Sequence, residues 1–248
     1  MIVTTIPHVL YKLDEIVRWC ENAGSRQGYF AALYRRMTLA VLEGMQQNMF
    51  ANNTRMEKLD VIFANRYIEA WSAYQSKQPV TKGWQVAFSS CENSGLIVIQ
   101  HLILGMNTHI NLDLSIATAD ASVGTDIFDL QSDFEKINLI MASLINETQE
   151  KLTKLWWPLA VISKIANDRD DDVINFSIAA ARKAAWANAV ALAHADANGR
   201  TNYINGIDNS ITAIANRIIQ PGSIINAKLK MVKMCEYDDV KKIIELIK

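Results

Sequence analysis

The sequence of residues 96–116 decides the fold, and it reads LIVIQHLILGMNTHINLDLSI. Its apolar residues cover every side of a helix, and a helix that is apolar all round lies in the centre of a folded domain. The pattern also permits a short buried strand over residues 96–104 that ends at Gly105. The length of the segment, from about residue 92 to residue 121, favours a helix. We therefore predict an all-α protein with a buried central helix near residues 92–121.

The segments on both sides of this stretch predict further helices. Apolar residues recur at three- and four-residue spacing, Gly24 offers a helix stop, and Asn52 offers a helix cap. No linker, repeat or low-complexity tract divides the chain, so we predict that residues 1–248 form one domain, a bundle of about eight to ten helices. The expected helices cover approximately residues 5–22, 29–50, 55–74, 92–121, 126–156, an alanine-rich segment after 170–172 that ends near 198, 209–219 and 237–247.

Composition excludes several classes of protein. The 10 glycines and 4 prolines are too few for a turn-rich β fold. With 25 basic and 26 acidic residues, the chain has no field that would attract nucleic acid or an anionic membrane. The most apolar run, Leu96 to Met106, is shorter than the roughly 20 residues of a membrane span. The N-terminus shows no export signal and the three cysteines form no metal-binding or redox motif, so a cytoplasmic protein is expected.

Polar side chains interrupt the central helix between His101 and Asp113. On a helix, His109 and Asp113 lie one turn apart on one face, whereas Asn107 and Asn111 share roughly the opposite face. An unsatisfied buried polar group costs about 1 to 3 kcal/mol, so each of these side chains needs a partner in the core or on a ligand. The segment is therefore the candidate functional site.

Two interpretations of these residues stay open. In the first, His109 and Asp113 form an acid/base pair or bind a metal, the carboxylate orienting the imidazole. His101 is a third candidate ligand, although it lies about 12 Å from His109 along a straight helix and would need a break at Gly105. In the second, the same residues form a hydrogen-bond network that fixes the helix register, with neutral histidines.

Two other helices carry charged residues on apolar faces. Asp60 shares an arc with aromatic residues, and Arg66 is expected to face elsewhere. Arg182 lines up with alanines and Trp186, so its guanidinium is expected over the Trp186 ring. A buried arginine requires an anion, which predicts an ion pair with Asp60 or Asp113, an anionic group of a substrate, or, failing both, an exposed side chain.

The segment Gly105 to Leu114 resembles the hallmark of an uncharacterised, all-helical bacterial family that is catalogued as a domain of unknown function. The hallmark is Gly-Met-Asn-Xaa-His-Ile-Asn-Xaa-Asp-Leu, and supporting similarity begins near Arg55 and includes the segments around Asp60, Arg182 and residues 219–222. The resemblance implies that one recurring constellation links Asp60, Asn107, His109, Asn111, Asp113, Arg182 and Trp186. It implies no activity.

These observations lead to one hypothesis and one rival. The hypothesis is an enzyme of hydrolase type, with its pocket between the central helix and the helices that bear Asp60 and Arg182. His109, Asp113 and Asp60 would be catalytic, and His109, Asp113 and His101 would hold any divalent Zn, Fe or Mn. Asn107, Asn111, Arg182 and Trp186 would bind a small-molecule substrate. The rival is a non-enzymatic binding or interaction module. Under either hypothesis, the chain can be a monomer or a homodimer.

Overall fold

The computed structural model of the chain describes residues 2–137, 140, 144 and 178–248. The described residues form ten α-helices, one π-helix and one 3₁₀ helix, and they contain no strand. The all-helical class is therefore confirmed, and the alternative of a strand at residues 96–104 is wrong. The extent of the domain, residues 1–248, stays a prediction.

The first three helices follow the apolar periodicity closely. They are α1 (Ile6–Ala23), α2 (Gln27–Gln46) and α3 (Asn53–Gln75). Gly24 ends α1 in a left-handed conformation, with φ of 61°, as a helix stop requires. The Asn52 side chain accepts a hydrogen bond from the Arg55 amide and so caps α3. The next helix, α4 (Lys82–Ser90), lies where no helix was expected.

The central helix has three consecutive parts. They are α5 (Val98–Thr108), the π-helix η1 (His109–Leu114) and α6 (Ser115–Ala121). Almost every residue in them is buried, which confirms the central helix, although it begins six residues later than residue 92. Gly105 permits the close approach of α2, because a Cβ atom there would lie 2.5 Å from Phe30 Cγ.

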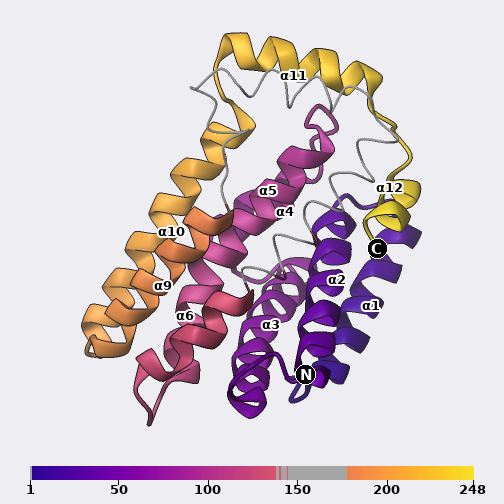
Figure 1. The fold of residues 1–248 in the computed structure, drawn as a ribbon. Helices are drawn as coiled ribbons and strands as arrows, with labels where there is room; N and C mark the ends of the chain where they lie inside the picture. Colours follow the sequence, from indigo (N-terminus) through magenta and orange to yellow (C-terminus); the bar gives the residue numbers. More distant parts are fainter. Residues whose placement is uncertain (1, 138–139, 141–143, 145–177) are drawn as a thin grey trace.

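The other helices surround this centre (Figure 1). The 3₁₀ helix η2 (Ile127–Leu130) leads into helical residues 131–137, and most of the helix expected over residues 126–156 lies outside the described residues. The alanine-rich segment forms α9 (Ile178–His194), and α10 (Ala197–Ile219) follows it directly, capped by Asp196. The alanine-rich helix was expected to end near residue 198, but it ends four residues earlier, and α10 begins well before residue 209.

Figure 1 shows α1, α2 and α3 on one side of the central helix and α9 and α10 on the other. Contacts of α5 and η1 with α2, α3, α4 and α10 agree with this arrangement. No helix was expected at α11 (Ser223–Cys235), which crosses one end of the bundle, and α12 (Val240–Ile247) begins three residues later than expected. In the described part of the chain, no helix is long and apolar enough to cross a membrane.

Candidate functional site

Asp113 is the most completely paired polar side chain of the central helix. It is buried, with 1% of its surface exposed. Its Oδ1 accepts a hydrogen bond from Arg66 Nε on α3 at 3.0 Å. Its Oδ2 accepts from Trp84 Nε1 on α4 at 2.9 Å and lies 3.0 Å from His109 Nδ1. One carboxylate therefore joins α3, α4 and η1.

The contact with Asp113 fixes the tautomer of His109. Because an ionised carboxylate only accepts hydrogen bonds, Nδ1 of His109 carries the proton and Nε2 carries a lone pair. Burial lowers the pKa of His109, and the bond to Asp113 opposes that shift only in part, so the ring is neutral. Within the described part of the chain, His109 Nε2 is buried and has no hydrogen-bond partner.

Aromatic rings hold the imidazole in place. The Phe63 ring stacks on it, with centroids 3.7 Å apart and planes 10° apart. The Tyr34 ring meets it edge-on at 4.4 Å. The rings of Phe30 and Tyr67 lie 5.6 and 5.8 Å away. Packing on this scale fixes the orientation of the ring, and so the direction in which Nε2 points.

A small cavity of about 50 Å³ lies beside His109. His109 from η1, Asp60 from α3 and Arg182 from α9 all line it, which is the combination that the sequence suggested for a pocket. The other described lining residues are mostly apolar: Phe30, Tyr34, Met37, Thr38, Val41, Met56, Leu59, Phe63, Met106, Ile110, Leu114 and Ile137. A cavity holds one water when it has about 10 to 15 Å³, so this one has room for a few waters or the end of a small molecule.

Asp60 differs from Asp113 in its surroundings. It is buried, with 7% exposed, and its Oδ2 has no hydrogen-bond partner among the residues that the structure describes. Burial raises the pKa of Asp60 to about 7, and the Glu57 carboxylate adds to the shift. Burial also raises the pKa of the Tyr34 hydroxyl well above its usual value, with a smaller contribution from Asp60. Asp60 can therefore gain or lose a proton near neutral pH.

Arg182 lies in the core, with 2% exposed, so the expectation of an exposed side chain is wrong. Its Nη2 donates to the carbonyl oxygen of Phe134 at 2.8 Å, and its guanidinium lies 4.4 Å from the centre of the Phe134 ring. The ring under this guanidinium is thus that of Phe134 and not that of Trp186, which packs against Phe134 at 5.0 Å. Burial lowers the pKa of Arg182 to about 9.

The cation that pairs with Asp113 lies on α3. Arg66 forms this ion pair, whereas the sequence pattern placed Arg66 on another face of α3. A helical wheel gives the direction of the Cβ atom, but the long arginine side chain reaches around the helix and remains 28% exposed. The contacts of Trp84 and Tyr34 with this site were not predicted from the sequence. No motif marks either residue, because helices distant in sequence bring them to His109 and Asp113.

His101 stands apart from this site. It is buried, and its ring meets Tyr29 at 5.9 Å. Burial lowers the pKa of His101 to about 3, with smaller contributions from Arg26 and Lys233. The break at Gly105 that would bring it to His109 does not occur, since α5 continues through Gly105. Among the described residues, no three His, Cys, Asp or Glu side chains gather as metal ligands, so His101, His109 and Asp113 do not form the expected set.

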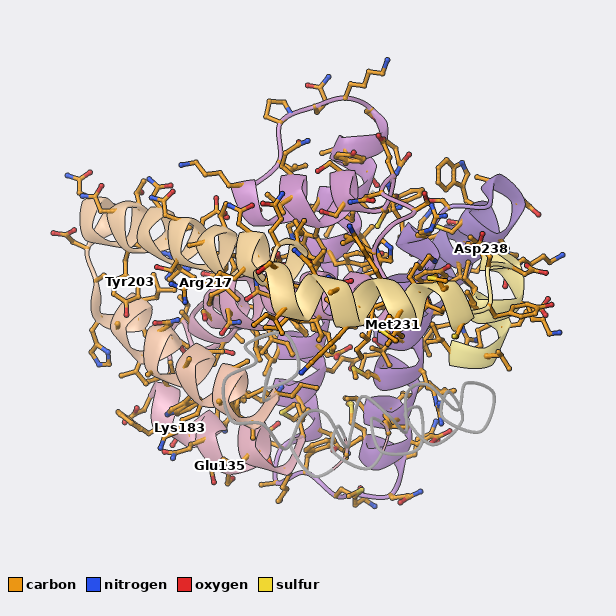
Figure 2. The ribbon with its side chains drawn as sticks, turned by 90° about the horizontal axis from the view of Figure 1, so that it is seen from above. Glu135, Lys183, Tyr203, Arg217, Met231 and Asp238 are labelled. Atoms are coloured by element: carbon orange, nitrogen blue, oxygen red, sulfur yellow. The ribbon has the colours of Figure 1, made fainter. Side chains whose placement is uncertain are left out.

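The two asparagines face away from the cavity, as their spacing from His109 suggested. Asn107 Nδ2 donates to the Ile211 carbonyl oxygen at 2.9 Å and ties the central helix to α10. Asn111 Nδ2 donates to the Asn107 carbonyl oxygen and side chain at 3.1 and 3.2 Å. Asn111 also lines an open groove of about 680 Å³ beside α9 and α10, together with Asn188 and Tyr203. Figure 2 shows Tyr203 between these two helices.

Comparisons with known proteins find a matching family for most of the chain, but they indicate no catalytic mechanism. The sequence profile of the Family of unknown function (DUF5995) matches residues 6–221. That range contains α1 to α10 and every residue of the cavity described above. No curated protein and no solved structure matches the chain. Any activity of the chain must therefore be inferred from its own side chains.

Proposed function

The chain belongs to this family of unknown function, and from its own geometry we propose that it is an enzyme that uses His109 as a general base in the buried cavity. One observation carries the proposal. Nδ1 of His109 is anchored on Asp113, Nε2 is buried with no partner among the described residues, and His109 lines a cavity with room for water. A neutral imidazole oriented by a carboxylate is an arrangement suited to proton abstraction.

The lining residues suggest how such a reaction would proceed. His109 Nε2 would take a proton from a water, and that water would attack the substrate. Asp60, with a pKa near 7, would donate a proton to the leaving group, and the Tyr34 hydroxyl would bind the substrate. The cavity is small and mainly apolar, so the reacting end of the substrate would be small and apolar as well. We place this hydrolase in the cytoplasm and its substrate among small molecules.

A divalent metal could take part only through a different set of ligands from the one first expected. Both oxygens of Asp113 already accept hydrogen bonds, and Asp113 is the residue that orients His109. His109 Nε2 and Asp60 remain as a nitrogen and an oxygen donor on the cavity. Zinc, iron and manganese accept such donors, with water or substrate in the remaining positions.

The test compares two buried histidines of the same helix. The His109→Gln variant removes the base, whereas His101→Gln removes a histidine that is not among the described lining residues. Both proteins are assayed against small acyl esters, amides and phosphate esters, with the metal content determined by elemental mass spectrometry. We expect hydrolysis to be lost by at least about 100-fold in His109→Gln and to persist in His101→Gln. Wild-type turnover by the His109→Gln variant would refute the proposal.

A second measurement needs no substrate. Nitrogen-15 NMR of the histidine rings reports which nitrogen carries the proton. We expect His109 at pH 6.5 to be neutral, with Nδ1 protonated and Nε2 bare, whereas a histidine in water is half protonated there. A doubly protonated His109 at that pH would rule out its role as the resting base.

The rival function rests on the three donors that surround Asp113. They join three helices, as the members of a purely structural network do. Under that interpretation His109→Gln would lower the stability of the fold and remove no activity. The position of His109 favours the enzyme, because this histidine combines an unpartnered Nε2 with a place in the lining of the cavity, as seen among the described residues.

A further inference from the structure

The helix α11 carries an exposed apolar stripe at the end of the bundle. Its inner side packs Leu229 and Val232 against Ile97 at the start of the central helix. Its outer side exposes Ile224, Met231 and Met234 by 74%, 70% and 86%. In Figure 2, α11 (yellow) lies in front of the other helices and carries the labelled Met231. The helix begins two residues after the end of the family match at residue 221.

The spacing of the stripe is that of a coiled-coil seam. Ile224, Ala227, Met231 and Met234 follow one another at intervals of three, four and three residues. At about 100° per residue, they fall within an arc of roughly 100° on the outer side of α11. An arc of this width accommodates one partner helix, and an alternation of three and four residues is the repeat of positions a and d. The outer face of α11 therefore has the form of half a helix pair.

Lysines border the stripe on both edges. Lys228 and Lys230 occupy the positions that correspond to e and g of the repeat. The helix contains three lysines and no acidic residue, whereas the whole chain has a net charge of -1. The third, Lys233, forms ion pairs with Glu236 and Asp238 at 3.2 and 3.4 Å on the inner side. The flanking positions thus carry two lysines, Ser223 and Cys235, and no acidic residue.

We propose that α11 is the docking site for an acidic amphipathic helix of a partner protein. The seam supplies apolar contacts, and the lysine border selects glutamate or aspartate at the flanking positions of the partner. A second copy of this chain fits poorly, because its own lysines would meet Lys228 and Lys230. A membrane surface fits poorly as well, because the stripe is narrow and contains no aromatic anchor. Methionines make the seam adaptable in its choice of partner.

The probe for the test is a synthetic three-heptad peptide with leucine at a and d and glutamate at e and g, labelled with fluorescein. A basic twin carries lysine at e and g. Fluorescence anisotropy with the full chain should show that the acidic peptide binds and that the basic twin does not. The Met231→Gln/Met234→Gln variant should bind the acidic peptide at least about ten-fold more weakly. The Lys228→Glu/Lys230→Glu variant should reverse the preference and bind the basic twin.

Two controls distinguish specific binding from unfolding of the variants and from nonspecific binding to exposed apolar side chains. Far-UV circular dichroism verifies that each variant keeps its helices. The Val123→Gln variant removes another exposed apolar side chain, 73% exposed and far from α11 in sequence, and should bind as the wild type does. Equal binding of the acidic peptide and its basic twin, or failure of the acidic peptide to bind, would overturn the proposal.

Two further outcomes would assign the surface to a different occupant. Cosedimentation of the wild type, but not of Met231→Gln/Met234→Gln, with vesicles of phosphatidylserine and phosphatidylcholine would identify a lipid surface. A dimer in sedimentation equilibrium that dissociates in the same variant would identify a second copy of the chain. Either result overturns the proposal of a partner helix.

Discussion

Two buried aspartates lie close to His109 and have opposite surroundings. Asp113 accepts hydrogen bonds from Arg66, Trp84 and His109, so its charge is compensated. Asp60 faces the cavity with one oxygen unpartnered among the described residues, and burial raises its pKa to about 7. The difference teaches that burial alone does not identify a structural carboxylate. The number of donors around it separates a residue that stabilises the fold from one that can exchange a proton.

The largest effect is expected from Asp113→Ala. This change leaves the Arg66 guanidinium, the Trp84 indole nitrogen and His109 Nδ1 without their acceptor, and breaking a buried ion pair costs roughly 3 to 5 kcal/mol. Urea denaturation followed by circular dichroism measures the loss in the free energy of unfolding. A loss below about 1 kcal/mol would mean that Asp113 is no more structural than Asp60.

The second effect depends on pH and concerns Asp60. Its pKa is about 7 in the folded protein and about 4 in the unfolded chain, so between these values only the folded state keeps the proton. The stability of the wild type should therefore fall as the pH rises from 4 to 7, by roughly 4 kcal/mol at most, relative to the Asp60→Asn variant. Urea denaturation of both proteins from pH 4 to pH 8 measures this difference. Parallel stability curves would contradict the raised pKa.

A smaller loss is expected from Trp84→Phe. The phenylalanine keeps most of the aromatic packing but removes one donor to Asp113 Oδ2 at 2.9 Å. Hydrogen bonds to charged groups contribute about 1.5 to 3 kcal/mol, so a loss of roughly 2 kcal/mol is expected in thermal or urea denaturation. If Trp84→Phe and Asp113→Ala lower the free energy of unfolding by the same amount, the three donors act as one unit. The contrast between the fully paired Asp113 and Asp60 would then be stronger.

The smallest change in stability is expected from Tyr34→Phe on the cavity side. The Tyr34 hydroxyl is buried with no hydrogen-bond partner within the described chain, so its removal should lower the free energy of unfolding by no more than about 0.5 kcal/mol. The same variant should be impaired in hydrolysis if the hydroxyl binds the substrate. Calorimetry and the ester assay together test this pair of expectations. A clearly destabilised Tyr34→Phe would assign the hydroxyl to the structure.

The sequence predicted the central helix and the division of its polar residues between two faces. His109 and Asp113 meet because they lie four residues apart on one helix, which is a local property. The donors from Arg66 and Trp84 depend on how α3 and α4 pack against η1, and no local pattern encodes that packing. Asp60 was predicted as a candidate from its apolar arc, but its missing partner and raised pKa follow from the tertiary structure.

Two helices, α4 and α11, were not predicted from the sequence, for related reasons. In α4, nine residues are too few to display a clear helical period. In α11, the exposed methionines and isoleucine blur the contrast between a buried and a solvated face, on which the prediction of amphipathic helices depends. The exposed apolar side chains that prevented the prediction of α11 are the same ones that suggest a docking surface.

The π-helix η1 restricts how the chain can change in length. Its wider turn accommodates extra backbone within one continuous helix, and it spans His109 to Leu114. Deleting one residue between His109 and Asp113 would remove that extra backbone and let the segment return to α-helical winding, so the helix downstream would keep its faces. Ser115 to Ala121 would then still pack against α3 and α9, but His109 and Asp113 would be three residues apart and would lose their present contact. The length of this segment therefore sets the contact between His109 and Asp113.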